Sequence, residues 1–305
     1  MKHLLTLADL SSEEIWRILH TARELKAAWK AGGNEPLLAG KSLAMVFEKP
    51  SLRTRTSFEM AMVHLGGHAL YLSPDEIGLG KRESAGDVAR VLSRYVDGIE
   101  ARVYAHRTIE ELAAYATVPV INGLSEWTHP CQALGDALTI WEHKGTIEGQ
   151  RLAFIGDGNN VANSLLFLGG KLGLHVTVAT PRGYEPHPAV LQLAREAATV
   201  SGARLSVSND PVAAVERADL VYTDVWASMG QEQEAAQRKT YFAPYQVNAE
   251  LMSHAPSGVQ FMHCLPAHRG EEVTDTVADA PYSIIFDQAE NRLHAQKAVL
   301  AILMA

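Results

Sequence analysis

The chain has 305 residues and a mass of 33.2 kDa, which is larger than one hydrophobic core usually becomes and predicts two domains. Apolar residues make up 47% and charged residues 20%, a composition that excludes a disordered chain. Lys and Arg number 27 against 35 Asp and Glu, so the formal net charge is -8 and no general attraction to nucleic acid or anionic membranes is expected. Any bound anion must be held by a local cluster of donors.

Short stretches of sequence indicate the cellular compartment. The run from Met1 to Leu7 is too short for the apolar region of a secretion signal, and the sequence has no window of about 18 apolar residues to span a bilayer. We therefore expect a cytoplasmic protein whose two cysteines, Cys131 and Cys264, are thiols. Neither cysteine has a partner at zinc-ligand spacing, so no metal is expected.

The first half of the chain opens with a helix and then alternates short β-rich runs with helical ones. Ser11 and Glu14 form a capping-box pattern ahead of apolar residues at helical spacing. Alternation of strands and helices predicts a parallel sheet with crossover helices. The predicted strands are 43–47, 69–72, 99–104 and 118–121, and the predicted helices between them are 56–65, 84–95 and 109–116.

A long helical run from Pro130 leads to the loop 145–149, where we place the domain boundary. The chain is therefore predicted to be an α/β protein of two domains, each a mostly parallel sheet flanked by helices. The domains are 1–144, with the helix 290–305 packing back on it, and 145–289. In the second domain the predicted strands are 152–155, 175–179, 205–207, 220–222 and 259–262, and the predicted helices are 161–172, 188–198, 212–217 and 231–239.

Ligands of open parallel sheets bind beyond the carboxyl ends of the strands, so the residues after each strand are the candidates for chemistry. The segment from Glu48 to Ser57 follows the first strand and opens a helix. It offers backbone N–H groups, two hydroxyls and two guanidinium groups within five residues, which favours a compact phosphate site. The alternative is a solvated helix start with arginines in surface ion pairs.

Two later loops carry polar side chains of other kinds. His129 and Gln132, at a helix start, could polarise a carbonyl and recognise an amide, although a structural histidine is the alternative. Asp224 could pair with an ammonium group, and the Ser228 hydroxyl could take a carboxylate, a combination that suits an amino acid. The alternative is a capping Asp with Met229 packed in the core.

The turn from Gly156 to Asn160 resembles the opening of a dinucleotide fingerprint. Val161 stands where the third glycine belongs, and the next strand ends in Thr180-Pro181-Arg182 instead of an acid. We therefore expect no nicotinamide cofactor and a tight turn that presents the Asn160 amide. Cys264, which follows the last strand, is by default a small buried hydrophobe.

Taken together, in order and spacing, these motifs resemble those of the aspartate/ornithine carbamoyltransferase family over nearly the whole chain. The loop Ser51-Leu52-Arg53-Thr54-Arg55 is shared with the aspartate enzymes. The Ser228-Met229-Gly230 loop and the stretch His263-Cys264-Leu265-Pro266 are typical of the ornithine enzymes. His129-Pro130-Cys131-Gln132 and Glu290-Asn291-Arg292 complete the resemblance.

The resemblance implies transfer of the carbamoyl group of carbamoyl phosphate to the δ-amine of L-ornithine, giving L-citrulline and phosphate, in a cleft between the domains. It implies no metal or other cofactor, and a homotrimer or multiple of trimers with active sites at subunit interfaces. By the resemblance, the phosphate is held by Ser51, the Leu52 backbone, Arg53, Thr54 and Arg55, and the carbamoyl end by Arg102, His129 and Gln132. Ornithine is held by Asn160, Asp224, Ser228 and Met229, while Cys264, Leu265 and Arg292 complete the site; the catalytic residues are Arg55, Arg102, His129 and Cys264.

These residue types suit that reaction. Attack builds negative charge on the carbonyl oxygen and the leaving phosphate, so fixed donors such as Arg55 and Arg102 lower the barrier, each by roughly 3 to 4 kcal/mol in comparable oxyanion sites. The δ-amine must attack as the free base, although its pKa in solution is about 10. Asp224 and Cys264 are expected to select the neutral amine, with the leaving phosphate as proton acceptor.

Two positions depart from the family pattern. Many relatives carry Thr where Leu52 stands, so only a backbone contact is expected there. The segment that reaches a neighbouring subunit's site often has Gln, whereas this chain has Glu76 in its 75–84 loop. An acid beside phosphate is unfavourable, and Glu76 is assigned no role.

Three alternatives stay open. A carbamoyltransferase for another amine, such as putrescine or an acylated ornithine, is disfavoured by Asp224 and the 228–230 loop. A nicotinamide-dependent oxidoreductase would have to use the turn from Gly156 to Asn160. A non-catalytic binding homologue is disfavoured because the charged residues of the resemblance are all present. The same site would serve arginine synthesis and arginine breakdown.

Overall fold

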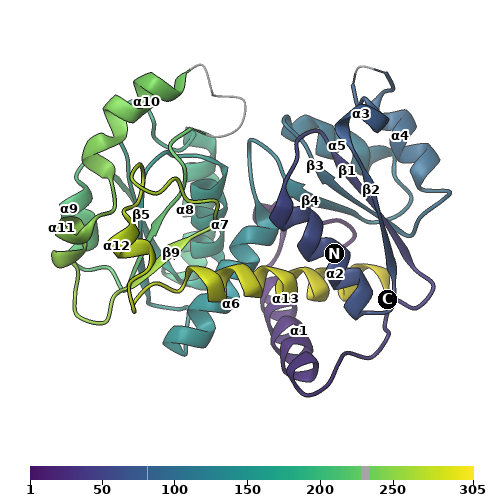
Figure 1. Ribbon diagram of the computed structural model, residues 1–305, viewed down its shortest axis with the longest axis horizontal. Helices are drawn as coiled ribbons and strands as arrows, with labels where there is room; N and C mark the ends of the chain where they lie inside the picture. Colours follow the sequence, from purple (N-terminus) through teal and green to yellow (C-terminus); the bar gives the residue numbers. More distant parts are fainter. Residues whose placement is uncertain (81, 228–233) are drawn as a thin grey trace. The chain divides into compact units, whose positions relative to one another are not determined.

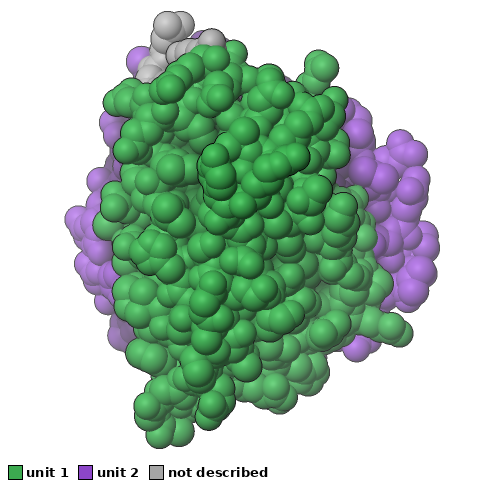
Figure 2. Space-filling model, turned by 90° about the vertical axis from the view of Figure 1, so that its right-hand side faces the viewer, with its two compact units in different colours: residues 1–138, 290–305 green, residues 139–289 purple. Residues whose placement is uncertain are grey.

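The computed structural model describes residues 1–80, 82–227 and 234–305, which form two compact units (Figure 1). Unit 1 comprises Met1–Leu138 and Glu290–Ala305, and unit 2 comprises Thr139–Ala289; Figure 2 colours them separately. The Ser228-Met229-Gly230 loop and the first residues of the predicted helix 231–239 lie outside the described residues.

Unit 1 is built on a four-stranded parallel sheet with the order β2-β1-β3-β4. Its strands are β1 (Ser42–Phe47), β2 (His68–Leu72), β3 (Gly98–Arg102) and β4 (Val120–Leu124). Its helices are η1 (Leu7–Asp9), α1 (Ser12–Lys30), α2 (Leu52–His64), α3 (Pro74–Ile77), α4 (Ala85–Leu92) and α5 (His106–Tyr115). α6 (Pro130–Lys144) leaves this unit, and α13 (Ile285–Met304) returns to it.

Local signals in the sequence account for several of these elements. The Ser11 hydroxyl accepts from the Glu14 N–H while the Glu14 carboxylate accepts from the Ser11 N–H, which confirms the predicted capping box. Buried apolar residues of β3, namely Ile99 and Ala101, pack with α4 and α5 on one face of the sheet. The opposite face carries Glu100 and Arg102, because successive side chains of a strand alternate.

The fourth strand lies later in the chain than predicted, at Val120–Leu124 instead of 118–121. Two observations explain the difference. The amino-terminal segment pairs with this strand, since Leu4 N donates to Val120 O and Asn122 N donates to Leu4 O. The register against β3 also shifts after Ala101, so that Arg102 faces Leu124. Both are tertiary contacts that local sequence does not encode.

Unit 2 is built on a five-stranded parallel sheet with the order β7-β6-β5-β8-β9. Its strands are β5 (Arg151–Ile155), β6 (His175–Ala179), β7 (Leu205–Ser208), β8 (Leu220–Thr223) and β9 (Gln260–His263). Its helices are α7 (Asn160–Leu172), α8 (Pro188–Ser201), α9 (Pro211–Val215), α10 (Ala235–Phe242), η3 (Ala243–Tyr245), α11 (Ala249–Ser253) and α12 (Asp275–Ala278).

The central strands of unit 2 are hydrophobic on both faces, as expected for a parallel sheet covered on both sides. Phe154 of β5 and Tyr222 of β8 are fully buried, and their rings stack with centroids 5.6 Å apart. With both sheets parallel and flanked by helices, the predicted α/β fold class is confirmed.

The last helix begins at Ile285, earlier than the predicted start at residue 290. Its first turns bury a polar residue in place of an apolar one, which hid the helical pattern. Gln288 is fully buried, accepts from the His263 N–H and donates to the Tyr222 hydroxyl. Phe286, two residues earlier, is largely exposed.

Each sheet has one point at which the strand order reverses, and ligands of such sheets bind there. In unit 1 the reversal lies between β1 and β3, and in unit 2 between β5 and β8. The loops after these four strands carry most of the residues singled out from the sequence. The helices in the described part of the chain include none with the length and apolar character to cross a membrane.

Candidate functional site

In unit 1, donors from four elements converge at the reversal point of the sheet. We call this group the anion cluster. It comprises Lys49, Ser51, Arg53 and Thr54 of the β1–α2 segment, Arg102 at the end of β3, His129 and Gln132 at the start of α6, and Arg292 of α13.

Thr54 is the centre of this cluster and is fully buried. Its hydroxyl oxygen accepts from a guanidinium nitrogen of Arg292, from Arg102 Nη1 at 3.4 Å and from Ser51 Oγ at 3.1 Å. Ser51 is also the N-cap of α2, because its Oγ accepts from the Thr54 N–H. The start of α2 therefore brings two hydroxyls to the guanidinium groups of Arg102 and Arg292, where a phosphate oxygen would meet charge-assisted donors.

The electrostatics of the cluster are strongly positive. Burial lowers the pKa of His129 well below its usual value, and the charges of Arg292, Arg102, Lys49 and Arg53 lower it further. The imidazole is therefore neutral, and it stands among four cationic side chains. Like charges gathered in a buried place are stabilised by an anion, so the cluster is built to receive one.

Gln132 has both ends of its amide engaged. Its Nε2 donates to Asp136 Oδ1 at 2.8 Å, and its Oε1 accepts from Arg292 Nη1 at 3.3 Å. Asp136 therefore fixes which end of the amide faces the arginine. Through Arg292, which also donates to Thr54, Gln132 lies at the same place as the segment after β1.

Lys49 is a member of the cluster that sequence reasoning did not assign to the site. Its side chain is buried, and its Nζ lies 4.6 Å from the centre of the Tyr104 ring. The sequence did contain a signal for Lys49, because this residue lies in the same loop after β1 as the predicted phosphate ligands. A small cavity of about 120 Å³ nearby is lined by Glu48 and Tyr104 but not by the arginines, so it is not the anion cluster.

Two predicted phosphate ligands lie away from these contacts. The Leu52 side chain is 77% exposed, which leaves only its backbone for a ligand. Arg55 is exposed, its Nε lies 3.6 Å from Glu59 Oε2, and its guanidinium group stacks over the Tyr71 ring at 4.1 Å. The structure therefore does not bring Arg55 into contact with Thr54.

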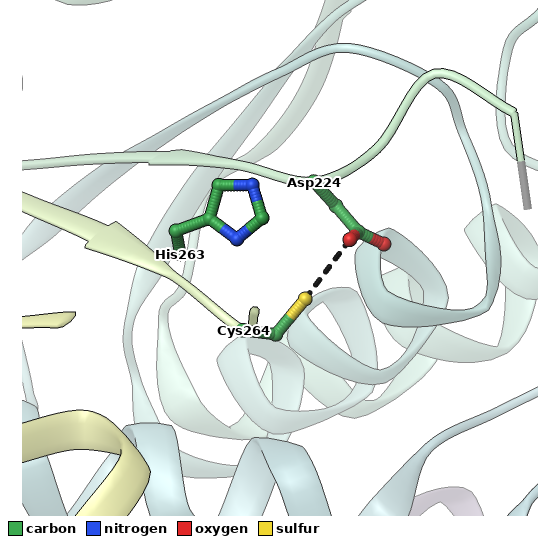
Figure 3. Close-up of side chains that lie close together, drawn as sticks. All are labelled: Asp224, His263 and Cys264. Carbon is green, nitrogen blue, oxygen red and sulfur yellow. Dashed lines mark hydrogen bonds between the residues drawn. The ribbon is translucent and has the colours of Figure 1, made fainter. Parts of the chain in front are cut away.

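In unit 2, Asp224 lies directly after β8 and gathers three donors, of which Figure 3 draws Cys264. Cys264 Sγ donates to Asp224 Oδ1 at 3.0 Å, and the Val225 N–H donates to the same oxygen at 2.8 Å. Asn159 Nδ2 donates to Asp224 Oδ2 at 2.8 Å. This carboxylate is buried and held in one orientation, as recognition of an ammonium or amine group requires.

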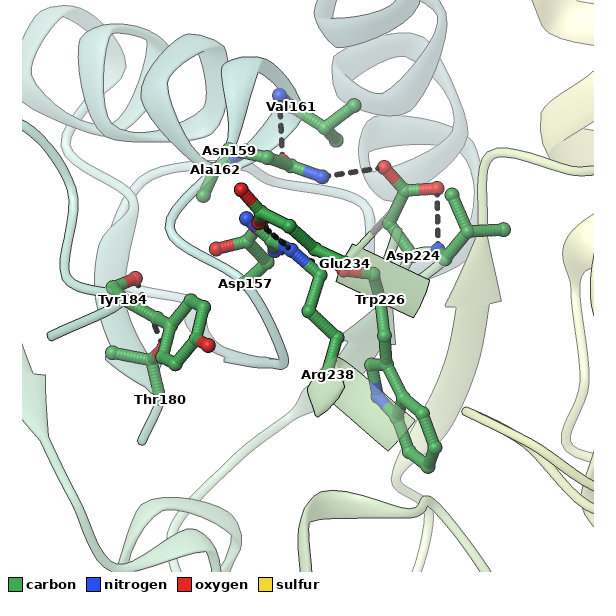
Figure 4. A network of polar contacts seen from close by, with 11 residues as sticks. Asp157, Asn159, Val161, Ala162, Thr180, Tyr184, Asp224, Trp226, Glu234 and Arg238 are labelled. Carbon is green, nitrogen blue, oxygen red and sulfur yellow. Dashed lines mark hydrogen bonds and ion pairs between the residues drawn. The ribbon is translucent and has the colours of Figure 1, made fainter. Parts of the chain in front are cut away.

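Asn159, the neighbour of the predicted ornithine ligand Asn160, makes the contact with Asp224. Asn159 is the N-cap of α7, and its Oδ1 accepts from the Val161 and Ala162 N–H groups (Figure 4). Asn160 is the first residue of the helix. An Asn directly before a helix is a recognisable cap, so the sequence did contain a signal for Asn159.

The glycine turn before this helix packs against the protein itself. A Cβ at Gly158 would lie 2.3 Å from the Pro186 N atom, and the Gly158 N–H donates to Tyr184 O. The first N–H groups of the helix are already capped by Asn159. These N–H groups of Gly158, Val161 and Ala162 are therefore engaged within the chain, whereas a dinucleotide pyrophosphate binds to open donors at such a turn.

Arg238 of α10 braces the two loops of this site (Figure 4). Its Nη1 donates to Asp157 Oδ2 at 2.7 Å and to the Trp226 carbonyl at 3.0 Å, while its Nε donates to Glu234 at 3.0 Å. Burial raises the pKa of Asp157 to about 6, although the adjacent guanidinium group of Arg238 opposes the shift. Arg238 thus connects the turn that bears Asn159 with the segment that follows Asp224.

Asp224, His263 and Cys264 place one possible metal-ligand atom each within 4.8 Å of one another. The histidine does not suit that use, because both of its ring nitrogens are engaged. Nδ1 accepts from the Leu265 N–H at 2.8 Å, so Nε2 carries the hydrogen and donates to Glu272 Oε1 at 3.1 Å. Neither contact leaves a ring lone pair for a metal.

Leu265 has a positive φ of 59°, a conformation that costs free energy for a branched residue. The Leu265 N–H bond to His263 helps to hold this conformation. Leu265 follows Cys264 directly, in the stretch whose resemblance to the ornithine enzymes implies a place at the ornithine site.

Glu76 has a structural explanation. Its carboxylate accepts from the Ser73 N–H at 2.8 Å and caps α3, and this hydrogen bond lowers the pKa of Glu76. The contact accounts for an acid at this position without a role toward substrate.

Comparison with known proteins relates both units to one family. Residues 2–142 match the carbamoyl-P binding domain and residues 148–303 match the Asp/Orn binding domain of aspartate/ornithine carbamoyltransferases. The anabolic ornithine carbamoyltransferase of Pyrococcus furiosus is 60% identical over 303 residues, which cover 99% of this chain and 96% of that protein. The ornithine carbamoyltransferase of Anoxybacillus flavithermus is 57% identical, with coverage of 99% and 96%.

Solved structures agree with the sequence comparison. An ornithine carbamoyltransferase structure from Pyrococcus furiosus has a TM-score of 0.97 at 60% identity, covering 99% of this chain and 97% of that one. The structure from Thermus thermophilus has a TM-score of 0.90 at 46% identity, with coverage of 100% and 99%. The chain belongs to the aspartate/ornithine carbamoyltransferase family.

Proposed function

We propose that this protein is an ornithine carbamoyltransferase, which transfers the carbamoyl group of carbamoyl phosphate to the δ-amine of L-ornithine. The observation that carries the proposal is the 60% identity over nearly the full length to a protein named for that activity. The two clusters support it, because one gathers cations for a phosphate and the other orients a carboxylate for an amine.

The reaction can be followed through the residues. The neutral δ-amine attacks the carbamoyl carbon, a C–N bond forms, and the C–O bond to phosphate breaks. Arg102 and Arg292 neutralise charge that grows on the leaving phosphate, and the neutral His129 polarises the carbonyl oxygen. The departing phosphate accepts the proton that the amine loses. We assign no covalent intermediate to this sequence of steps.

Ornithine recognition depends on unit 2. Asp224 orients the amine through the oxygens that Asn159 and Cys264 hold in place. Ser228 and Met229 are proposed to take the α-amino acid end, and Leu265 lies beside Cys264 in the same stretch of chain. The amine must be neutral to attack. Cys264 is proposed to contribute as a thiol that donates a hydrogen bond to Asp224.

The phosphate ligands are proposed to include Ser51, the Leu52 backbone, Arg53 and Thr54 of unit 1. The assignment of Arg55 as a catalytic residue remains a proposal, and it requires its guanidinium group to leave Tyr71. A family-like homotrimer is likewise proposed, in the cytoplasm. Light scattering after size-exclusion chromatography should give three times 33.2 kDa or a multiple of that mass.

A steady-state assay with four amines tests the proposed function. Carbamoyl phosphate is held at saturation, and kcat/KM is measured with ornithine, putrescine, aspartate and acetylornithine. We expect ornithine to exceed each of the others by about 100-fold or more, because the acceptor site recognises a free amino acid by several polar contacts that an analogue leaves unpaired. A preference for another amine would refute the assignment.

A further inference from the structure

Glu100 is a buried carboxyl group with no role in the reaction described so far. It lies in the middle of β3, two residues before Arg102, and its side chain is fully buried. Among the described residues, none forms a hydrogen bond with either of its carboxyl oxygens. A buried polar group without such a partner is costly, so its presence calls for an explanation.

The geometry around Glu100 is tight. A Cβ at Gly123 of β4 would lie 1.7 Å from Glu100 Oε1 and 2.8 Å from its carboxyl carbon. The carboxyl group therefore fills the space that a side chain at Gly123 would occupy. In the sheet register Glu100 stands between Met45 of β1 and Ile121 of β4, neither of which can titrate.

The charged and titratable neighbours of Glu100 come from three elements. Arg102 lies on its own strand, and alternation puts both side chains on one face. Arg292 approaches from α13 and Cys131 from α6, and both interact electrostatically with the carboxyl group. Arg102 and Arg292 are the two arginines that share the Thr54 hydroxyl in the anion cluster.

We propose that Glu100 sets the charge available in the anion cluster: as a neutral acid it leaves Arg102 and Arg292 to the phosphate, and as a carboxylate it competes with the phosphate for them. This inference rests on the proposed role of the cluster as the phosphate site. Glu100 does not touch the substrate in this scheme and acts through the two arginines, so it is a positioning residue.

The charge state of Glu100 changes within an accessible pH range. Burial raises the pKa of its carboxyl group to about 8, although Arg102 and Arg292 oppose the shift. Below that pH the carboxyl group is neutral and the cluster keeps its full positive charge. Above it, the carboxylate offsets part of that charge and phosphate binding weakens relative to a protein without the carboxylate.

The test is the binding of inorganic phosphate to the full chain by calorimetry at pH 6.5 and pH 9.5, for wild type, Glu100→Gln and Glu110→Gln. Glu110 is an exposed residue of α5, so at pH 9.5 its substitution removes the same charge as Glu100→Gln without altering the cluster. We expect the same affinity for all three proteins at pH 6.5. At pH 9.5 the Glu100→Gln protein should bind phosphate more tightly than the other two proteins, by about 5-fold or more.

Proton uptake by the wild-type protein provides a second measurement. Binding of a dianion beside Glu100 favours its protonated form, because coupling between two sites is reciprocal. Phosphate binding at pH 9 should therefore take up protons, measured by calorimetry in buffers with different ionisation enthalpies. The Glu110→Gln protein should show the same uptake.

The outcomes separate this proposal from the one on which it rests. An unchanged affinity ratio between wild type and Glu100→Gln at the two pH values, or no proton uptake by wild type, would overturn the role of Glu100 and leave the phosphate site standing. Weaker binding by Glu100→Gln at pH 6.5 would also overturn it. Failure of wild type to bind phosphate at pH 6.5 would contradict the phosphate site itself, and this inference with it.

Discussion

The thiol of Cys264 donates a hydrogen bond to the carboxylate of Asp224, with Sγ 3.0 Å from Oδ1. Because the sulfur is the donor, the contact holds the Asp224 carboxylate in one orientation. Asn159 holds the other oxygen of the same carboxylate. Asp224 is thereby fixed from both sides.

Removing the thiol should impair ornithine use selectively. Cys264→Ala deletes the donor to Asp224, and we expect the KM for ornithine to rise about 5-fold or more, since one hydrogen bond contributes about 1 kcal/mol. Cys264→Ser keeps a donor at that position, so its KM for ornithine should lie between those of wild type and Cys264→Ala. Steady-state kinetics at saturating carbamoyl phosphate measure both variants. Equal kinetics for Ala and wild type would show that the hydrogen bond is dispensable.

Asn159 has two separable functions. Asn159→Ser keeps a helix N-cap but loses the donor to Asp224, whereas Asn159→Ala loses both. We expect the alanine variant to lose about 1 kcal/mol in its free energy of unfolding and the serine variant to lose little. Both should raise the KM for ornithine. Urea unfolding and kinetics on the same samples distinguish the effects, and a normal KM in the serine variant would refute the role toward Asp224.

Thr54 should matter for carbamoyl phosphate and not for ornithine. Thr54→Val keeps the shape of the side chain but removes the oxygen shared by Arg102 and Arg292. Hydrogen bonds to charged groups contribute about 1.5–3 kcal/mol, so the KM for carbamoyl phosphate should rise roughly 10-fold or more. The matched control is Thr56→Val, at an exposed position of the same helix. A similar rise in the KM for carbamoyl phosphate in both variants would mean that the Thr54 hydroxyl makes no specific contribution to binding.

Arg238 should be needed for the stability of unit 2. Arg238→Met leaves the buried carboxylate of Asp157 without its partner, and breaking a buried pair costs about 3–5 kcal/mol. Asp157→Asn with Arg238→Met removes both charges and should recover part of that loss. Urea unfolding of the single and double variants measures the coupling. If the loss in the double variant equals or exceeds the sum of the two single losses, the ion-pair interpretation is wrong.

The pH dependence of stability offers an independent check on Glu100. The folded pKa of about 8 lies above the ordinary value of 4.5, so the folded state retains a proton that the unfolded state loses. Its stabilising contribution is complete below pH 4.5 and is lost as the pH rises to 8. Relative to Glu100→Gln, wild type should lose up to ~1.4 kcal/mol of unfolding free energy per pH unit in that window. A constant difference between pH 5 and pH 8 would contradict the raised pKa.

Several features of the fold and site were predictable because their signals are local. The capping box of Ser11 and Glu14 is confirmed by its hydrogen bonds, and the strand and helix alternation gave the parallel sheets. The start of α13 was placed too late because Gln288 is buried through hydrogen bonds to another segment and breaks the apolar pattern. The cap of α7 by Asn159 is also a local signal, because an Asn directly before a helix is a common N-cap.

The sequence by itself determined the order of the elements and which chemical groups follow each strand, because hydrophobic periodicity, caps and turns involve residues a few positions apart. Only the tertiary structure decided which of those groups meet. Thr54 accepts from Arg292 across 238 positions, and Asn159 donates to Asp224 across 65. The physical reason is that such pairs depend on the order of strands within a sheet and on the packing of helices against it. The same packing buries Glu100 beside two arginines and leaves Arg55 at the surface.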